Sequence, residues 1–203
     1  MLRHVGAHRS FRHNVRLATL LSLNAGFINA AGFIAFSVLT TNVTGHAALL
    51  AVNAAQGRWR EVRMVALWLS LFLAGAFFSA WLIGWIGRRK SVAYTIPIVL
   101  IIGVLVRIIF WGPAYDHSLQ ETELFAGSLL FAMGMQNALV SVISGSVVRT
   151  THLTGMMTDL GIDLSAVVHS FKNVGPVLAR RVKLRLVIIL SFLSGGLVGG
   201  YLF

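Results

Sequence analysis

Five long apolar stretches dominate the chain, and they occupy residues 17–37, 64–87, 92–112, 122–146 and 184–203. Each stretch reaches or approaches the roughly 20 residues that a helix needs to cross a hydrocarbon core of about 30 Å. Of all residues, 57% are hydrophobic and 11% are charged, and the mean hydropathy is +0.81. Such a chain has too little polar surface to coat a soluble globule. The sequence therefore predicts an all-α, polytopic transmembrane helical bundle.

Two further segments, residues 44–57 and 153–170, are shorter or more polar, and they bring the expected helical segments to seven. Both overlap a repeated Thr-x-x-Thr-Gly motif, which occurs at Thr41–Gly45 and at Thr151–Gly155. If both segments cross the membrane, the two halves of the chain are parallel, whereas two re-entrant segments make the halves inverted. The membrane topology therefore depends on these two short segments.

The distribution of positive charge does not decide between the two topologies. Either arrangement places thirteen of the 17 Lys and Arg residues on the inner side, together with the N-terminus. The acidic loop with Asp116, Glu121 and Glu123 favours re-entrant segments, although acidic residues contribute little to orientation. Residues 153–170 nearly suffice to cross as a helix at about 1.5 Å per residue. We therefore expect both short segments to span, with re-entry as the alternative.

The two motifs belong to a longer internal match. Gly26–Ala30 (GFINA) aligns with Gly134–Ala138 (GMQNA), and beyond the motifs Phe72–Gly75 aligns with Phe192–Gly195. Asn and Thr-x-x-Thr-Gly recurring in register are not general features of membrane helices, so we interpret the match as a duplication. The predicted organisation is a basic cytoplasmic tail at 1–16 and one transmembrane domain at 17–203, which comprises repeat one (17–87), a connecting helix (92–112) and repeat two (122–203).

These segments resemble the YoaK-like multi-pass inner-membrane proteins of bacteria, a family catalogued as a domain of unknown function. The resemblance rests on GFINAAGF at Gly26–Phe33, TNVTGH at Thr41–His46, GMQN at Gly134–Asn137 and TGMMTDLG at Thr154–Gly161. It covers nearly the whole chain from about Leu17 onward. It implies a multi-pass protein of the bacterial inner membrane and brings no established substrate.

Asp159 and Asp163 are the most unusual residues of the predicted membrane region. Their spacing of four places them on one face of a helix, and an ionisable group in a membrane helix is expensive and commonly functional. Two carboxylates in a low dielectric indicate a proton or cation site. In the alternative, Asp159 caps or hydrogen-bonds a neighbouring helix and Asp163 reaches an interface.

The other candidate solute-binding or ion-binding residues are neutral. Asn29 and Asn137 place amides in the first helix of each repeat, and Gln136 adjoins one of them; hydrogen bonding between helices is the alternative role. The motifs contribute Thr44, Gly45, Thr154 and Gly155, and Thr158 follows one turn later. Thr and Gly at a helix start favour a half-helix whose positive end faces an anion, or capping alone.

We expect a small-solute secondary transporter or permease, with Asp159 and Asp163 as candidates for proton coupling. The alternative is a non-transporting membrane scaffold that senses lipid or a partner. We expect no enzyme, because no recognisable catalytic motif is present, and neither cofactor nor metal. The chain has no Cys, which excludes thiolate sites. Lys and Arg gather at helix ends, a pattern that favours anionic lipid headgroups over nucleic acid.

Overall fold

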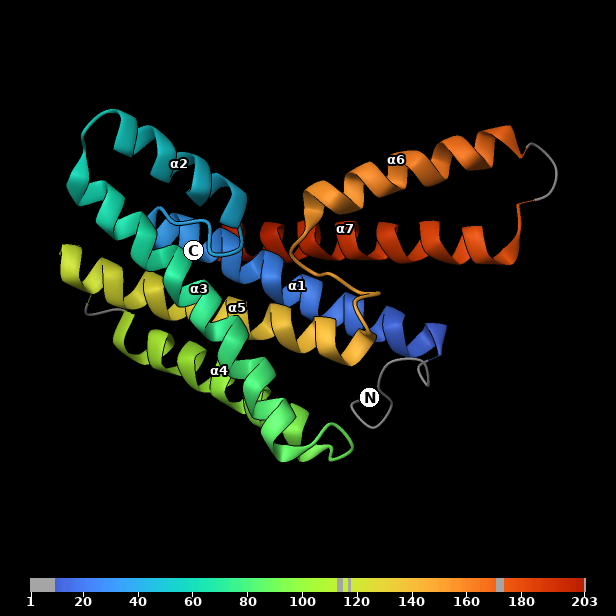
Figure 1. Cartoon of the computed structure of the whole chain (residues 1–203), viewed down its shortest axis with the longest axis horizontal. Helices are drawn as coiled ribbons and strands as arrows, with labels where there is room; N and C mark the ends of the chain where they lie inside the picture. The colour runs from blue at the N-terminus through green and yellow to red at the C-terminus, as the bar shows by residue number, and fades with distance from the viewer. Residues whose placement is uncertain (1–9, 113–114, 117, 171–173, 203) are drawn as a thin grey trace.

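The computed structural model describes residues 10–112, 115, 116, 118–170 and 174–202, and all regular secondary structure within these ranges is helical. In this described part, seven helices follow one another (Figure 1): α1 (Phe11–Phe36), α2 (Val43–Ala55), α3 (Trp59–Ile86), α4 (Val92–Trp111), α5 (Leu119–Ser144), α6 (Leu153–His169) and α7 (Pro176–Leu202). The all-α fold class and the seven expected segments are confirmed. Helix α1 begins inside the predicted basic tail, of which residues 1–9 lie outside the described part.

Five of the helices, α1, α3, α4, α5 and α7, are long and apolar enough to cross a membrane. Helix α2 has 13 residues and α6 has 17. At about 1.5 Å per residue these helices measure roughly 20 and 26 Å, less than a hydrocarbon core of about 30 Å. Length alone therefore separates five membrane-crossing helices from two short ones.

Helices α1 and α5 both start at a serine cap and end in a left-handed residue. Ser10 accepts a hydrogen bond from the backbone N–H of His13, and Ser118 accepts one from that of Glu121. At the other ends Ser37 has φ 55° and Gly145 has φ 63°. A residue in this conformation ends a helix and reverses the chain direction.

After each reversal the chain folds back toward the middle of the helix that it has just left. The backbone N–H and the hydroxyl of Thr41 both donate to the Asn29 side-chain oxygen, at 3.0 and 2.9 Å. In the second half, the Thr151 hydroxyl donates to the Asn137 side-chain oxygen at 3.0 Å. Asn29 lies about 10 Å along the helix from Phe36, the last residue of α1. Helices α2 and α6 therefore begin at mid-depth.

From mid-depth, each short helix returns to the end from which its loop came. Phe36, near the end of α1, shares a buried cluster with Val65 and Trp68 from the first half of α3. Ile143, near the end of α5, shares another with Leu184 and Ile188 from the first half of α7. Neither short helix crosses the molecule, and this path agrees with the re-entrant alternative and not with the spanning arrangement expected from length.

The long helices form two closely packed parallel pairs, α1 with α7 and α3 with α5 (Figure 1). A Cβ built on Gly26 of α1 would overlap the carbonyl of Phe192 in α7, and one built on Gly134 of α5 would overlap that of Phe72 in α3. The absence of a side chain at these glycines lets the backbones touch. Residues that align in the sequence thus make corresponding contacts in the two halves.

Helix α4 lies against α5 and α3, outside these two pairs. Of the acidic residues noted in the sequence, only Asp116 lies between α4 and α5, because Glu121 and Glu123 belong to the first two turns of α5. The backbone N–H of Ser118 donates to the Asp116 carboxylate at 2.7 Å, and hydrogen bonding to Ser118 lowers the pKa of Asp116. Asp116 is therefore held at the start of α5 by its hydrogen bonds with Ser118 and Glu121.

Candidate functional site

The two re-entrant helices begin next to each other near the middle of the molecule and diverge in opposite directions (Figure 1). A cavity of about 390 Å³, hereafter the central cavity, lies at their starts. Residues that align in the sequence line it in pairs: Asn29 and Asn137, Thr41 and Thr151, Thr44 and Thr154, and Phe72 and Phe192. The central cavity is therefore built from both halves of the chain.

The two asparagines support the central cavity and also face it. Asn29 and Asn137 each use the side-chain oxygen to hold a threonine of the returning loop. Within the described ranges neither NH₂ group has a hydrogen-bond partner in the protein. Each asparagine therefore fixes the start of a short helix and retains a hydrogen-bond donor at the central cavity.

The two helix starts differ in how their free backbone N–H groups are satisfied. The Asn42 side chain accepts a hydrogen bond from the backbone N–H of Gly45 at 3.0 Å and caps α2. His152 occupies the same place before α6 and makes no side-chain cap. The first N–H groups of a helix have no partner within it and carry partial positive charge. The α6 start therefore offers unoccupied donors to a negatively polarised group.

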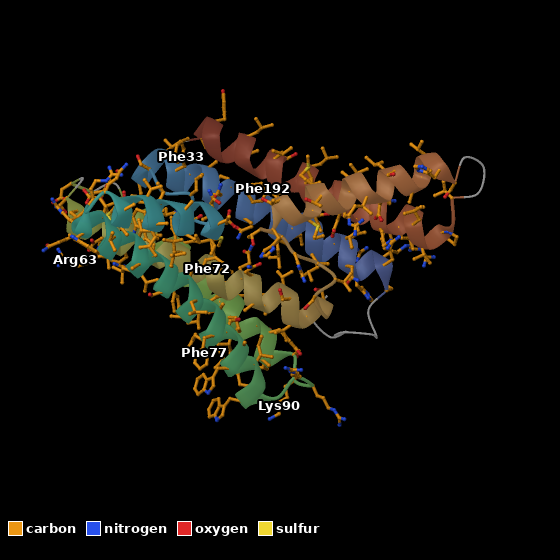
Figure 2. The ribbon with its side chains drawn as sticks, turned by 45° about the horizontal axis from the view of Figure 1, so that its top comes forward. Phe33, Arg63, Phe72, Phe77, Lys90 and Phe192 are labelled. Carbon is orange, nitrogen blue, oxygen red and sulfur yellow. The ribbon has the colours of Figure 1, made fainter. Side chains whose placement is uncertain are left out.

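Two phenylalanines complete the wall of the central cavity. Figure 2 places Phe72 of α3 and Phe192 of α7 in the middle of the molecule, whereas Arg63 and Lys90 lie toward ends of helices. The described lining contains no Asp, Glu, Lys or Arg. Donors at two helix starts between apolar rings suit a small polar or anionic solute, and they disfavour a cation.

Five of the predicted site residues line the central cavity: Asn29, Asn137, Thr44, Thr154 and Gly155. Gly45 lies one residue further into α2, where its N–H donates to the Asn42 cap. Gln136 lies elsewhere as a link between helices, since it accepts from Asn24 at 2.6 Å and donates to the Leu21 carbonyl at 2.9 Å. The Thr158 hydroxyl donates to the Thr154 carbonyl of its own helix.

The structure brings Asp159 and Asp163 to arginines of α7 and not to the central cavity. Asp163 is 3% exposed and pairs with Arg185, and its other carboxylate oxygen lies 3.4 Å from Arg181. Arg185 also pairs with Asp159 at 3.3 Å and donates to the Asp159 backbone carbonyl at 2.8 Å. The network joins α6 to α7, so Asp159 contacts a neighbouring helix as the alternative expected, whereas Asp163, which the alternative placed at an interface, is buried.

Several residues of the site were not singled out from the sequence. Arg181 and Arg185 are spaced by four on α7, like the two aspartates of α6, so the matched spacing was a usable signal. Asn42 was identifiable from its preference for helix caps. Phe72 and Phe192 appeared in the internal match, but nothing in the sequence indicated that they line a cavity.

The family model described as "Protein of unknown function (DUF1275)" matches residues 17–203, which include every residue that lines the central cavity. No curated protein and no solved structure matches the chain. The match supports the coarser part of the resemblance noted in the sequence, an uncharacterised domain family, while the YoaK-like name stays a resemblance. This integral membrane protein belongs to the DUF1275 family of proteins of unknown function.

Proposed function

We propose that this protein is a permease for a small polar or anionic solute, which passes through the central cavity. In this proposal α1–α3 and α5–α7 are inverted repeats, and their re-entrant helices meet at the middle of the bilayer. Half-helices whose N-termini point at a shared mid-membrane site are a recurring way to bind solutes in transporters.

The observation that carries this proposal is the pairing of polar groups around the central cavity. Non-helical backbone at membrane depth is tolerated only where it is buried in protein or lines a water-filled space. Here both returning loops, with Thr41 and Thr151, lie against the cavity. Two equivalent polar loops enclosing one space are what a pathway through a pseudo-symmetric bundle requires, whereas a scaffold has no need of them.

The same topology supports an orientation. Re-entrant segments leave the start of α1, the α3–α4 turn and the start of α7 on one side, and the positive-inside rule makes this side cytoplasmic. Arg88, Arg89 and Lys90 lie in that turn, while Arg58 and Arg63 lie near the start of α3. We propose a bacterial inner membrane with a cytoplasmic N-terminus.

The position of Asp159 and Asp163 argues for uncoupled permeation over proton coupling. Both carboxylates pair with arginines of α7, and neither lines the central cavity through which the solute passes in this proposal. A pH gradient across the membrane is therefore expected to leave the flux of the uncharged solutes glycerol and urea unchanged. Flux that follows the gradient in the wild type and loses this dependence in Asp163→Asn would restore the proton-coupled version.

The test of permeation is osmotic swelling of proteoliposomes, followed by stopped-flow light scattering with glycerol, urea and formate as solutes. Gly155 lines the central cavity and a Cβ there meets nothing within 4 Å, so Gly155→Leu is expected to fill the pathway without disturbing packing. Gly161→Leu is the matched control, because this α6 glycine also has open space and does not line the cavity.

We expect swelling faster than in protein-free vesicles for at least one of these solutes, a rate near that of protein-free vesicles for Gly155→Leu, and a wild-type rate for Gly161→Leu. Equal rates with and without protein for all three solutes would contradict permeation of this solute class and favour the scaffold alternative. Equal rates in the two leucine variants would contradict a route through the central cavity.

A further inference from the structure

A second cavity, hereafter the basic pocket, lies between α6, α7 and the loop that leads into α6. Its volume is about 290 Å³, and its charged lining consists of Arg149, Arg181, Arg185 and Asp159. Met156, Leu184 and Ile188 are among its apolar lining residues. The basic pocket is thus separate from the central cavity, and the two have no lining residue in common.

We propose that the basic pocket binds an anionic phosphate group, presented by the headgroup of a membrane lipid. Three guanidinium groups meet two carboxylates here, because Asp163 contacts Arg181 and Arg185 from beneath the lining. One positive charge remains without a counter-charge. A phosphodiester carries one negative charge, and guanidinium groups bind phosphate oxygens in pairs of hydrogen bonds.

Two of the three arginines retain donors for such a ligand. Arg185 is occupied by both aspartates, and its side chain is 18% exposed. Arg181 contacts Asp163 through one nitrogen at 3.4 Å, and its side chain is 55% exposed. Arg149 is exposed and forms no ion pair within the described ranges. A phosphate between Arg149 and Arg181 therefore gains partners without displacing the buried Asp163–Arg185 pair.

The position of the basic pocket suits a lipid. Arg181 lies about 8 Å along α7 from its first residue, Pro176, and Arg185 about 14 Å. Leu184 and Ile188 are buried, 8% and 1% exposed, and form an apolar wall beside the guanidinium groups. Basic pockets between membrane helices on the cytoplasmic side recognise lipid headgroups in this way. The arginines near the start of α7 and the apolar residues further along it correspond to the phosphate of a phospholipid headgroup and to the hydrocarbon chains that follow it.

The re-entrant architecture by itself does not require this cluster. Positions of the first half that align with Asp159, Arg181 and Arg185 hold Leu49, Glu61 and Val65. Helices α2 and α3 pack against each other without an ion pair between their described residues, so α6 and α7 did not need surplus arginines to pack. The excess of positive charge therefore points to a ligand.

The test uses the full chain in detergent, with thermal unfolding followed by intrinsic fluorescence during titration with dioleoyl phosphatidylglycerol. Dioleoylglycerol controls for the acyl chains, and inorganic phosphate supplies the same group without a lipid. Arg149→Gln removes a donor of the basic pocket, and Arg180→Gln makes the same change of charge at a neighbouring α7 residue that does not line it.

We expect the phosphatidylglycerol to raise the unfolding temperature, dioleoylglycerol and inorganic phosphate to leave it unchanged, and Arg149→Gln to weaken the lipid effect at least about tenfold in midpoint concentration. Arg180→Gln should behave as the wild type. Equal stabilisation by dioleoylglycerol, or the same midpoint in both arginine variants, would overturn the site. Saturation by inorganic phosphate that leaves no further effect of lipid would overturn the lipid as the source of the phosphate.

Discussion

At the scale of single residues, the hydrogen-bond and ion-pair partners of a polar side chain decide its role in the membrane region. The side-chain oxygen of Asn29 and that of Asn137 each accept a hydrogen bond from a threonine of the returning loop. The NH₂ group of each asparagine remains available at the central cavity. Asp163 is buried and fully engaged by arginines of α7. Both kinds of residue are polar and lie in apolar helices, yet the asparagines line the central cavity and Asp163 does not.

The Asp163 network leads to a prediction about stability. Asp163→Asn leaves Arg185 with one carboxylate fewer in a buried setting, and removal of one partner of a buried pair costs about 3–5 kcal/mol. Asp159→Asn should cost about 0–1 kcal/mol, because the Asp159 side chain is 46% exposed and its pairing is screened. Unfolding in detergent, measured for both variants, checks the difference. Equal losses would contradict a buried clamp between α6 and α7.

At the scale of helices, the pairs of long helices form where small residues let two helix backbones come into contact. Helix α1 contacts α7, and α5 contacts α3, through glycines at aligned positions. The contact atoms on the partner helices are backbone carbonyls, which cannot rotate away as a long side chain can. Small residues at crossing points are how membrane helices gain packing contacts that lipid cannot replace.

We therefore predict that a single methyl group is destabilising at these crossings and harmless elsewhere. Gly26→Ala forces α1 away from Phe192, and overpacking of this kind costs about 1–3 kcal/mol. Gly84→Ala, in α3 where a Cβ meets nothing within 4 Å, should be neutral or stabilising by up to about 1 kcal/mol, because alanine favours a helix. Thermal unfolding in detergent compares them, and a loss at Gly84 equal to that at Gly26 would count against close backbone contact.

At the scale of the whole molecule, the two short helices determine how the direction of the long helices alternates along the chain. Helices α1 and α7 run in the same direction, and α3 and α5 run in the opposite one (Figure 1). The start of α1 and the end of α7 therefore lie on opposite sides. In this arrangement the two halves have opposite orientations, and their short helices begin next to each other near the middle of the molecule.

The topology is testable by cysteine labelling, because the chain contains no native Cys. We expect Arg60→Cys to react with an impermeant maleimide added outside intact cells, and Arg89→Cys to react only after the membrane is opened. The reason is that α3 starts on the side where α1 ends. The opposite labelling pattern would mean that α2 and α6 cross the membrane.

The sequence by itself determined the class of fold and the residues of interest. Five apolar stretches are local features, and their length is sufficient to predict membrane helices because the bilayer imposes one thickness. The repeated motif located both returning loops, and Asn29, Asn137, Thr44, Thr154 and Gly155 were recognisable as unusual polar or small residues. The sequence pattern did not show how deep each short segment reaches into the molecule. The number of Lys and Arg residues on the inner side is the same whether the two segments span or re-enter.

Only the tertiary structure decided the path of the two short helices and the partners of the polar residues. The hydrogen bonds from Thr41 to Asn29 reverse the chain inside the bundle, and the pair of Asp163 with Arg185 joins residues on different helices. Both features depend on how separate segments of the chain are placed relative to each other. Hydrophobic burial is non-directional, so the apolar pattern of one segment does not specify this placement. A re-entrant helix is stable because its exposed polar ends meet groups from elsewhere in the chain, so its identity as re-entrant is a property of the assembled molecule.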